Sequence, residues 1–553
     1  MAPTRSLRLP LRPCTLAAAM LGLLLGTAAR AADPAGEPPV PAPDAAGQPV
    51  APPVSPATAE PVKRVVFLPE TVRAQLIEEV KQEVLERARR EGWAAPNQVP
   101  AWVTRFKLSG DLRGRFDRTI FPSGNASGGE FPDWNAINTG KPFDMKGIVL
   151  DNDRYLNVDR SRSRPRLRAR MGAEVTPDHG VQVVLRLGSG ENGSPLSNNQ
   201  TLGASGGMFS KYQVWLDRAY LRLDPREGEA SSIALLLGRF DNPFLGTDLL
   251  WWDDLAFDGV ALTAKADVGV GLTPFLTGGV FPVYTTAFSY PGERPDKFRS
   301  WNKWLYAAQV GARWAPRPAL SVQLAAALYD FENVSGRPSS PCDTNLSATS
   351  CDTDELRPSF AQKGNSYMEL RTPSALALGL EATGSAPRYQ YFGLASRFRE
   401  LAATARVELA LGSSVRLGLD GEYVRNVGFR KATVGAKALN NRGPLAADQS
   451  VGAFVGGGTG FLGQVSVGTP ALAGRWDWKV RLDYRRLESD AVLDAFNDPD
   501  FGQGGTNLQG FSLDATVGLA QGLIARTRWY SANQVVGPKY AVDGLLVDVL
   551  QRF

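Results

Sequence analysis

Histidine is almost absent from this chain: its 553 residues include a single one, His179, in the turn-like segment "TPDHG". One histidine supplies neither a histidine-based catalytic triad nor a site with several histidine ligands. The segment "GGGTGFLG" matches a dinucleotide-binding spacing at Gly458, Gly460 and Gly463, but no helical pattern follows it. These glycines are therefore interpreted as loop residues. We expect no enzymatic activity, no metal and no cofactor.

Cysteine is also scarce. Of three cysteines, Cys14 lies near the N-terminus, and only Cys342 and Cys351 follow, in "SSPCDTNLSATSCDTDE". Two cysteines without partner histidines make a poor metal site, and in an oxidising compartment close spacing favours a bond between them. We predict a Cys342–Cys351 disulfide.

Long apolar runs are missing beyond the N-terminus. The run "TLAAAMLGLLLGTAA" follows Arg5, Arg8 and Arg12 and leads to an Ala-Arg-Ala sequence at 29–31. It is shorter than the roughly 20 apolar residues that a membrane-spanning helix needs. A basic start, a short apolar segment and an A-x-A site indicate a secretory signal peptide over 1–31.

Two further segments precede a change of pattern. Residues 32–66 are rich in proline and alanine and are expected to form an extended periplasmic tether. Residues 67–95 are predicted to form an amphipathic helix, with Ile77, Val80 and Val84 at coiled-coil-like spacing. Its segment 67–92 either associates with copies of itself, as in a homo-trimer, with the rim of the following domain or with another envelope component, or is a spacer.

A strong excess of one charge is missing too, because 61 basic residues nearly balance 56 acidic ones. Together with export, this balance argues against a nucleic-acid partner. The basic excess is local, in "RSRSRPRLRARMGAE", where arginine occupies alternate positions: Arg160, Arg162, Arg164, Arg166, Arg168 and Arg170. A β-strand sends alternate side chains to opposite faces, so this period collects the arginines on one face.

The period of two continues through residues 101–553. It is clear in "RFKLSGDLRGRFD" and in "RWDWKVRLDYR", and tryptophan and tyrosine gather toward the ends of such segments. Long strands with one charged face, short turns alternating with long loops and aromatic ends are typical of membrane barrels. We predict an all-β, antiparallel, up-and-down transmembrane barrel of about 16 strands (range 14–18), given about 9–11 membrane residues per strand.

The energetic cost of exposing arginine to lipid decides which face is which. A lipid-facing arginine near the midplane costs roughly 2–4 kcal/mol, so the row is expected to face an aqueous lumen. The predicted pore-lining set adds arginines of other strands: Arg113, Arg115, Arg186, Arg218 and Arg222. Candidates for an inward-folded constriction loop are Asp151, Asp153, Asp253, Asp254 and Asp258. Alternatively, these acids pair with surface arginines. Asp217 is out of pattern, since it shares the parity of Trp215 and Leu221.

Several segments between 104 and 265 resemble the "putative porin" family of bacterial outer-membrane proteins: "FKLSGDLRGRFD", "RSRPRLRARMGAE", "VVLRLGSGENGSPLSNNQTL", "FSKYQVWLDRAYLRL" and "LGRFDNPFLGTDLLWWDDLAFDGVAL". The resemblance implies a single-chain barrel in contact with outer-membrane lipid, through which small solutes diffuse. The last strand, "YAVDGLLVDVLQRF", places Leu545, Val547, Val549 and Phe553 on one parity. Such an ending resembles the signal read by the barrel-assembly machinery.

Three functional hypotheses follow. The leading one is passive diffusion through an arginine-lined lumen that prefers small anions. A related one is a phosphate- or carboxylate-specific porin, in which the arginines form a guiding ladder. A third is a structural barrel whose tether links the outer membrane to periplasmic material.

Overall fold

The computed structural model describes residues 78–80, 82–83, 105–149, 154–177, 180–191, 193–226, 231–287, 296–445 and 451–553. The predicted signal peptide, the tether, most of the helix at 67–95, Asp151, Asp153 and His179 lie outside these residues. Within the helix segment, residues 78–80 and 82–83 are helical and exposed. The chain divides into two units, 1–94 and 95–553, and the second contains the sheet described below.

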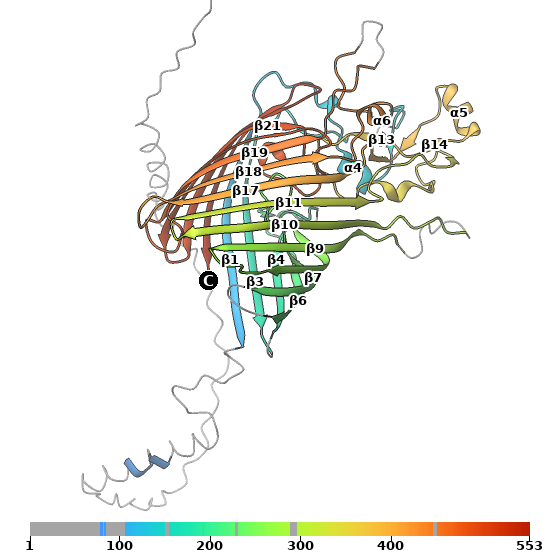
Figure 1. Cartoon of the computed structure of the whole chain (residues 1–553). Helices are drawn as coiled ribbons and strands as arrows, with labels where there is room; N and C mark the ends of the chain where they lie inside the picture. The colour runs from blue at the N-terminus through green and yellow to red at the C-terminus, as the bar shows by residue number, and fades with distance from the viewer. Residues whose placement is uncertain are drawn as a thin grey trace, which may run out of the picture. The chain divides into compact units, whose positions relative to one another are not determined.

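This sheet is antiparallel and closes on itself (Figure 1). It has 17 strands among the described residues, and one of them, β5 (Gln200–Thr201), has only two residues and lies in a loop. The remaining 16 confirm the predicted number. In chain order they are β1 (Phe106–Ile120), β3 (Arg162–Val175), β4 (Val181–Ser189), β6 (Val214–Arg226), β7 (Ser232–Asp241), β8 (Ala256–Lys265), β9 (Leu272–Tyr284), β10 (Lys303–Arg317), β11 (Leu320–Glu332), β17 (Arg399–Ala410), β18 (Arg416–Asn426), β19 (Thr459–Gly468), β20 (Trp478–Leu487), β21 (Leu508–Ala520), β22 (Leu523–Gln534) and β23 (Ala541–Arg552).

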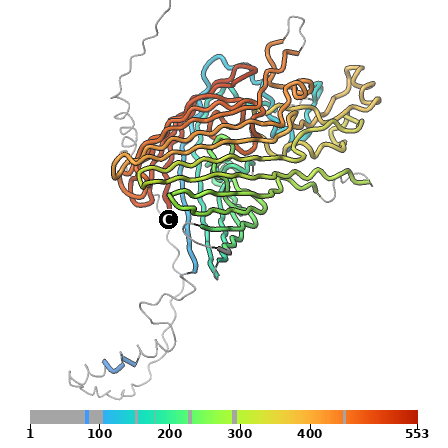
Figure 2. Tube along the Cα trace, in the orientation of Figure 1, coloured from blue at the N-terminus to red at the C-terminus, as the bar shows by residue number. Residues whose placement is uncertain are grey.

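Each long strand pairs with its neighbours in sequence, and the first strand closes the barrel. β1 pairs with β3 on one side and with β23 on the other. The connections alternate in length, as the sequence pattern predicted. Short turns such as 318–319 and 521–522 join the strands at one end, and the other end carries long loops such as 121–161, 333–398 and 427–458. Figure 2 shows these loops gathered at one end of the barrel.

The loops contain the remaining short elements. The helices are α4 (Trp134–Thr139), α5 (Ala375–Ala382) and α6 (Lys431–Gly435), with 3-10 turns at Gly128–Glu130, Asp354–Leu356 and Phe501–Gln503. The short strands are β2 (Phe143–Asp144), β12 (Pro341–Cys342), β13 (Tyr367–Glu369), β14 (Thr372–Pro373), β15 (Tyr389–Gln390) and β16 (Phe392–Leu394). They pair as β12–β14 and β13–β16 within the 333–398 loop, and as β2–β15, which joins the 121–161 loop to the 333–398 loop.

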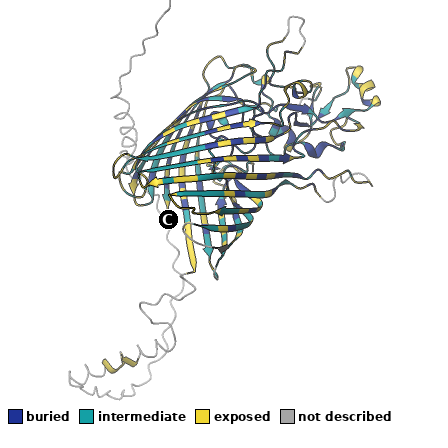
Figure 3. Cartoon of the chain, viewed as in Figure 1, coloured by how far each residue is buried: buried dark blue, intermediate teal, exposed yellow. Residues whose placement is uncertain are grey.

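Burial follows the alternation of the sequence (Figure 3). In β1, Asp111, Arg113 and Arg115 are buried, whereas Leu112 and Phe116, of the other parity, are 48% and 45% exposed. Because successive side chains of a strand point to opposite faces, the charged residues turn inward and the apolar ones outward. No helix in the described part of the chain is long and apolar enough to cross a membrane.

The C-terminal residue closes the seam of the barrel. The backbone N–H of Gly110 donates to the Phe553 carbonyl oxygen at 2.9 Å, and the N–H of Phe553 donates to that of Gly110 at 3.1 Å. A Cβ atom at position 110 would lie 2.6 Å from the ring of Phe553, so this position requires glycine. The ring of Phe553 thus packs against the backbone of β1 at Gly110.

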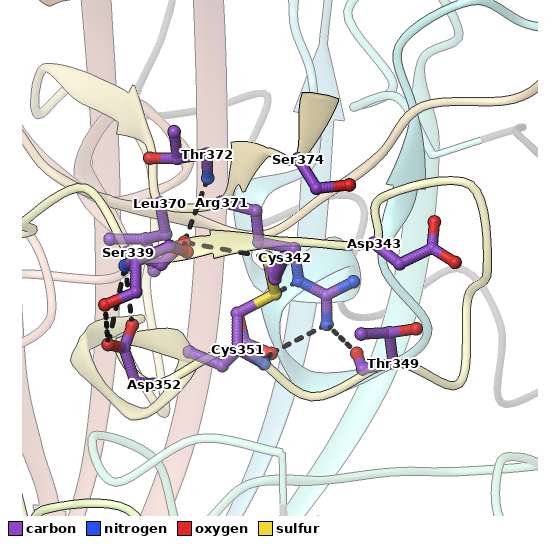
Figure 4. The surroundings of a disulfide bond; sticks show 12 residues. Ser339, Cys342, Asp343, Thr349, Cys351, Asp352, Leu370, Arg371, Thr372 and Ser374 are labelled. Carbon is purple, nitrogen blue, oxygen red and sulfur yellow. Dashed lines mark hydrogen bonds and ion pairs between the residues drawn. A yellow bond between two sulfur atoms is a disulfide. The ribbon is translucent and has the colours of Figure 1, made fainter. Parts of the chain in front are cut away.

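Cys342 and Cys351 form the predicted disulfide in the 333–398 loop, with Cα atoms 6.0 Å apart (Figure 4). The bond closes the segment 342–351, and Arg371 binds the end of this segment from outside it. Its guanidinium donates to the Thr349 carbonyl oxygen at 2.8 Å and to the Asp354 carboxylate at 2.7 Å. The outer loop is thereby joined to the strand pair β12–β14.

Candidate functional site

The arginine row of β3 lies on the inner face of the barrel. Its residues pair across the sheet with inward residues of β1, so that Arg164 lies opposite Asp117 and Arg166 opposite Arg115, while Arg168 lies opposite Arg113. Met171, of the other parity, is 62% exposed. The charged face and the apolar face are therefore separated as the period of two requires.

The first two arginines of the predicted row differ from the other four. Arg160 precedes β3, has a side chain that is 88% exposed and lies 3.6 Å from the carboxylate of Asp159. Arg162 is the exposed first residue of β3 and pairs in register with Thr119. These two arginines lie at the loop end of the barrel, beyond the buried part of the wall.

Carboxylates interleave with the buried arginines. Asp111 accepts from Arg168 and Arg170, at 2.9 and 2.7 Å. Asp117 accepts from Arg164 at 2.8 Å and lies 3.4 Å from Arg166. The guanidinium of Arg115 contacts Asp548 of β23 and Asp500 of a loop, each at 2.6 Å. The row is consequently a network of ion pairs and not a ladder of bare cations.

A loop crosses the lumen and joins its walls. Residues 242–255, named here the β7–β8 loop, exchange hydrogen bonds with β10, where the N–H of Leu245 donates to Gln309 at 2.8 Å. The Thr247 hydroxyl donates to Glu422 of β18 at 2.6 Å. At its far end, Asp254 accepts from Arg168 and Arg170 of β3 at 2.9 and 2.8 Å. Since β3 and β18 lie on nearly opposite walls in the strand order, the loop spans the interior.

An apolar cluster anchors this loop against the wall formed by β7 to β11. The rings of Phe244 and Trp251 pack on Tyr329, with ring centroids 5.3 and 5.1 Å apart. Phe244 also contacts Phe257 and Phe281 of the same wall. All five rings are at most 6% exposed, so the cluster is a buried core inside the barrel. One wall is therefore apolar and covered, and the opposite wall is charged.

A second loop, residues 488–507 or the β20–β21 loop, also folds inward. Its Asp498 accepts from Arg485 and Arg528 at 3.0 and 2.7 Å. The two inward loops meet directly, since the N–H of Trp252 donates to the Phe496 carbonyl oxygen at 2.9 Å. The N–H of Asp498 donates to the carbonyl oxygen of Asp248 at 3.3 Å. Two loops, far apart in sequence, narrow the same lumen.

The acidic groups of the β7–β8 loop have shifted pKa values. The charge of Asp248, together with burial, raises the pKa of Asp253 to about 7. Burial opposes ionisation of Asp254 as well, but the charges of Arg168 and Arg170 outweigh it and hold that pKa below its ordinary value. Adjacent carboxylates thus differ: Asp254 is ionised at neutral pH, and Asp253 titrates near it.

Arg113 stands apart from its neighbours. Its side chain is 7% exposed, and it donates one hydrogen bond, to the amide oxygen of Asn199 at 2.6 Å. Its Nε is buried without an acceptor in the part of the chain that the structure describes, and no carboxylate lies within ion-pairing distance there. The side chains opposite it in β3 and β23 are Arg168 and Leu550. Arg113 is a buried cation in the neighbourhood of Asp254, at the β8 end of the β7–β8 loop.

The out-of-pattern Asp217 has a structural cause. A β-bulge shifts the β4–β6 register between Arg186 and Leu187, so Arg186 lies opposite Arg218 while Leu187 lies opposite Leu216. The extra residue, Asp217, is buried and accepts from Arg186 at 2.6 Å and from Arg218 at 2.8 Å. A bulge reverses side-chain parity, which a strict period of two does not anticipate.

The other predicted residues of this region divide between the two faces. Arg222 has the inward parity of Arg218 and lies 2.8 Å from Asp224. Asp258 is a strand residue of β8, has the parity of the exposed Val260 and contacts Arg239 at 2.9 Å. It lies on the outer face and does not belong to the constriction loop. Pairing with a surface arginine, the alternative for these acids, applies to Asp258.

A cavity of about 540 Å³ opens above the inward loops. Its lining includes Ser197 and Asn198 of the 190–213 loop, Lys303 of β10, Phe360 of the 333–398 loop and Phe496 of the β20–β21 loop. Segments that are distant in sequence therefore build an entrance at the loop end of the barrel.

The sequence analysis missed the residues that fix the inward loops. The pattern places Gln309 and Glu422 on the polar faces of strands but does not indicate that they bind a loop. Asp498 and Asp500 were not among the candidate residues. A signal for the last two was present in "DAFNDPDFGQGG", where acids and turn-forming residues interrupt the strand pattern.

The comparison with known families decides the identity. The family described as "Putative porin" matches residues 24–553. The chain belongs to this family. The match extends the resemblance seen at 104–265 over the whole of the barrel, including the two inward loops. None of the curated proteins matches this porin.

Solved structures with a similar chain trace include outer-membrane proteins. The outer-membrane channel DcaP of Acinetobacter baumannii is 10% identical, with 81% of this chain and 97% of that one covered and a TM-score of 0.37. OprB of Pseudomonas putida is 12% identical, with coverages of 82% and 95% and a TM-score of 0.39. OmpF of Salmonella typhi is 9% identical, with coverages of 81% and 97% and a TM-score of 0.35.

Proposed function

We propose that this porin is a passive channel of the bacterial outer membrane, through which small hydrophilic solutes and ions diffuse, and that it prefers anions. Family membership supports the channel role. The apolar outer face, with Leu112 48% and Val549 47% exposed, supports contact with lipid. A wall of charged side chains supports a water-filled interior, because only water or counter-charges make buried arginines tolerable.

The observation that carries the anion preference is the uncompensated Arg113. Its neighbours Arg115 and Arg168 each contact two carboxylates, so their charges are largely balanced. Arg113 has an amide partner only. The net field where the β7–β8 loop meets the charged wall is therefore positive at Arg113. A permeating anion gains from this charge and a cation loses.

Planar bilayer recordings under a salt gradient test the proposal. We expect the wild-type reversal potential to favour anions, and Arg113→Gln to lower the anion-to-cation permeability ratio. Asn199→Asp is expected to do the same, since it neutralises Arg113 in place with a carboxylate. Arg118→Gln is the matched control, because Arg118 is exposed on β1 and has the outward parity. A cation-favouring wild-type channel contradicts the preference, and absence of conductance contradicts the channel.

A further inference from the structure

A second cavity, of about 440 Å³, lies at the loop end of β18, β19 and β20. Arg425 and Val427 line it from the end of β18, and Lys431 from the start of α6. The other side consists of the glycine run 456–458, with Glu488 after β20. This glycine run belongs to the segment whose dinucleotide-like spacing was interpreted as a loop.

The cavity faces outward, at the edge of the apolar band. Arg425 lies opposite Leu401 and Thr459 and has the parity of Tyr423, which is 47% exposed. It is the last outward residue of β18, so the outer surface changes here from apolar to charged. In a membrane barrel this is the level of the lipid headgroups.

Two cations of this cavity lack partners. Arg425 and Lys431 are both exposed, and neither makes a hydrogen bond or an ion pair among the residues that the structure describes. Other outward cations nearby are engaged: Arg399 contacts Asp330 at 2.5 Å, and Arg486 donates to Gln509 at 2.6 Å. Arg425 and Lys431 therefore bring unpaired positive charge to the lining of the cavity.

The single carboxylate of the cavity, that of Glu488, offsets at most one of these two positive charges. Glu488 accepts from the backbone N–H and the hydroxyl of Thr459, at 2.9 and 2.8 Å, through the same oxygen. A Cβ atom at position 457 would lie 2.2 Å from a carboxylate oxygen of Glu488, so this side chain lies directly against the glycine run. The carboxylate is thus held against the loop backbone.

The glycine run also leaves hydrogen-bond donors free. The N–H of Gly457 donates to the Ser489 hydroxyl at 3.2 Å. The N–H groups of Gly456 and Gly458 donate to no acceptor within the described ranges. Two cations and two unused amide donors around one cavity suit an anion with several oxygens, such as a phosphate group.

We propose that this cavity binds the phosphate group of an outer-membrane lipid. Arg425 and Lys431 supply the charge, and the glycine amides supply further donors. The acyl chains continue along the outer face over Tyr423 and Phe461, which are 47% and 42% exposed. A bound lipid of this kind fixes the height of the barrel in the bilayer at this edge. The inference rests on the proposed membrane location but not on the selectivity of the channel.

Native mass spectrometry of the full chain in detergent tests this site. Phosphatidylglycerol is the probe, and diacylglycerol is the matched lipid without phosphate. We expect the wild type to retain phosphatidylglycerol and not diacylglycerol, and Arg425→Gln/Lys431→Gln to lower the retained fraction at least fivefold. Arg430→Gln is the control, because Arg430 is an adjacent exposed arginine that does not line the cavity.

The remaining outcomes separate the alternatives. Equal retention by the double variant and the control overturns the site, and so does displacement of the lipid by millimolar inorganic phosphate, which would identify a site for soluble phosphate. Conductance in planar bilayers is measured for the same preparations. A double variant that conducts like the wild type but loses the lipid supports the inference, whereas a wild type that retains the lipid without conducting contradicts only the channel proposal.

Discussion

Replacing Asp254 by asparagine tests how the inward loop sets the field in the lumen. The substitution removes one negative charge at the β8 end of the β7–β8 loop but keeps an oxygen that can accept from Arg168 or Arg170. Both arginines also keep Asp111, at 2.9 and 2.7 Å, so the wall retains its structure. The change is therefore electrostatic, with little loss of folded protein.

The size of the effect follows from Coulomb's law. For an ion that passes about 7 Å from the carboxylate in a water-like medium, the interaction is about 0.6 kcal/mol, or about a threefold change in occupancy. The change has opposite signs for anions and cations. The anion-to-cation permeability ratio should therefore rise about sevenfold in Asp254→Asn, as measured from reversal potentials in dilute salt.

The control is Asp258→Asn, which removes the same charge four residues away on the outer face. We expect it to leave the ratio unchanged. At about 1 M salt, where the Debye length is about 3 Å, the effect of Asp254→Asn should shrink. An unchanged ratio in Asp254→Asn at low salt, or equal shifts in the two variants, would refute the assignment of the loop to the ion path.

Lowering the pH through about 7 should raise the anion preference, because the pKa of Asp253 is raised to about 7 and its carboxylate is neutral below that pH. Reversal potentials at pH 5 and 9 should therefore differ in the wild type and coincide in Asp253→Asn. Glu422→Ala removes the acceptor of the Thr247 hydroxyl and N–H, and should lower the free energy that holds the β7–β8 loop in place by about 1–3 kcal/mol. The looser loop should increase the noise of the single-channel current, and an unchanged noise level would contradict this role of Glu422. Cys342→Ser/Cys351→Ser should cost the outer loop about 3 kcal/mol and speed its proteolysis while leaving the heat-resistance of the barrel on gels intact; equal proteolysis rates would contradict this. Gly110→Leu should lower the yield of folded barrel, since the new side chain occupies the place of the Phe553 ring, and Gly114→Leu, where a Cβ atom meets nothing within 4 Å, is the control.

The barrel itself could be predicted from the sequence because lipid and water act on every strand in the same way. Arg168 and Leu167 face opposite media, and a shift by one residue would reverse both at once, so the period of two is kept strand after strand. The strand number follows from the same repeated signal. The disulfide was predictable because only two of the three cysteines lie outside the predicted signal peptide, and two cysteines allow one pairing.

The interior could be predicted only in part, because long-range contacts determine it. Asp254 meets Arg168 across 86 residues of sequence, and no local pattern distinguishes it from Asp258, which faces outward. Asp217 was out of pattern since a single-residue bulge reverses parity without a sequence signature. The positive charge of the inner wall is balanced in part by Asp500 and Asp548, and their partner Arg115 lies near the other end of the barrel sequence.

The contact between the two inward loops has a consequence for how the channel comes into being. The backbone of Trp252 and that of Phe496 are joined across the interior, yet they belong to the early and the late part of the chain. This contact needs both loops, and therefore the strands that flank them: β7 and β8 on one side, β20 and β21 on the other. The bore of the pore is therefore complete only when strands from both halves of the barrel are present, and a barrel that lacks either pair of strands also lacks this contact across its interior.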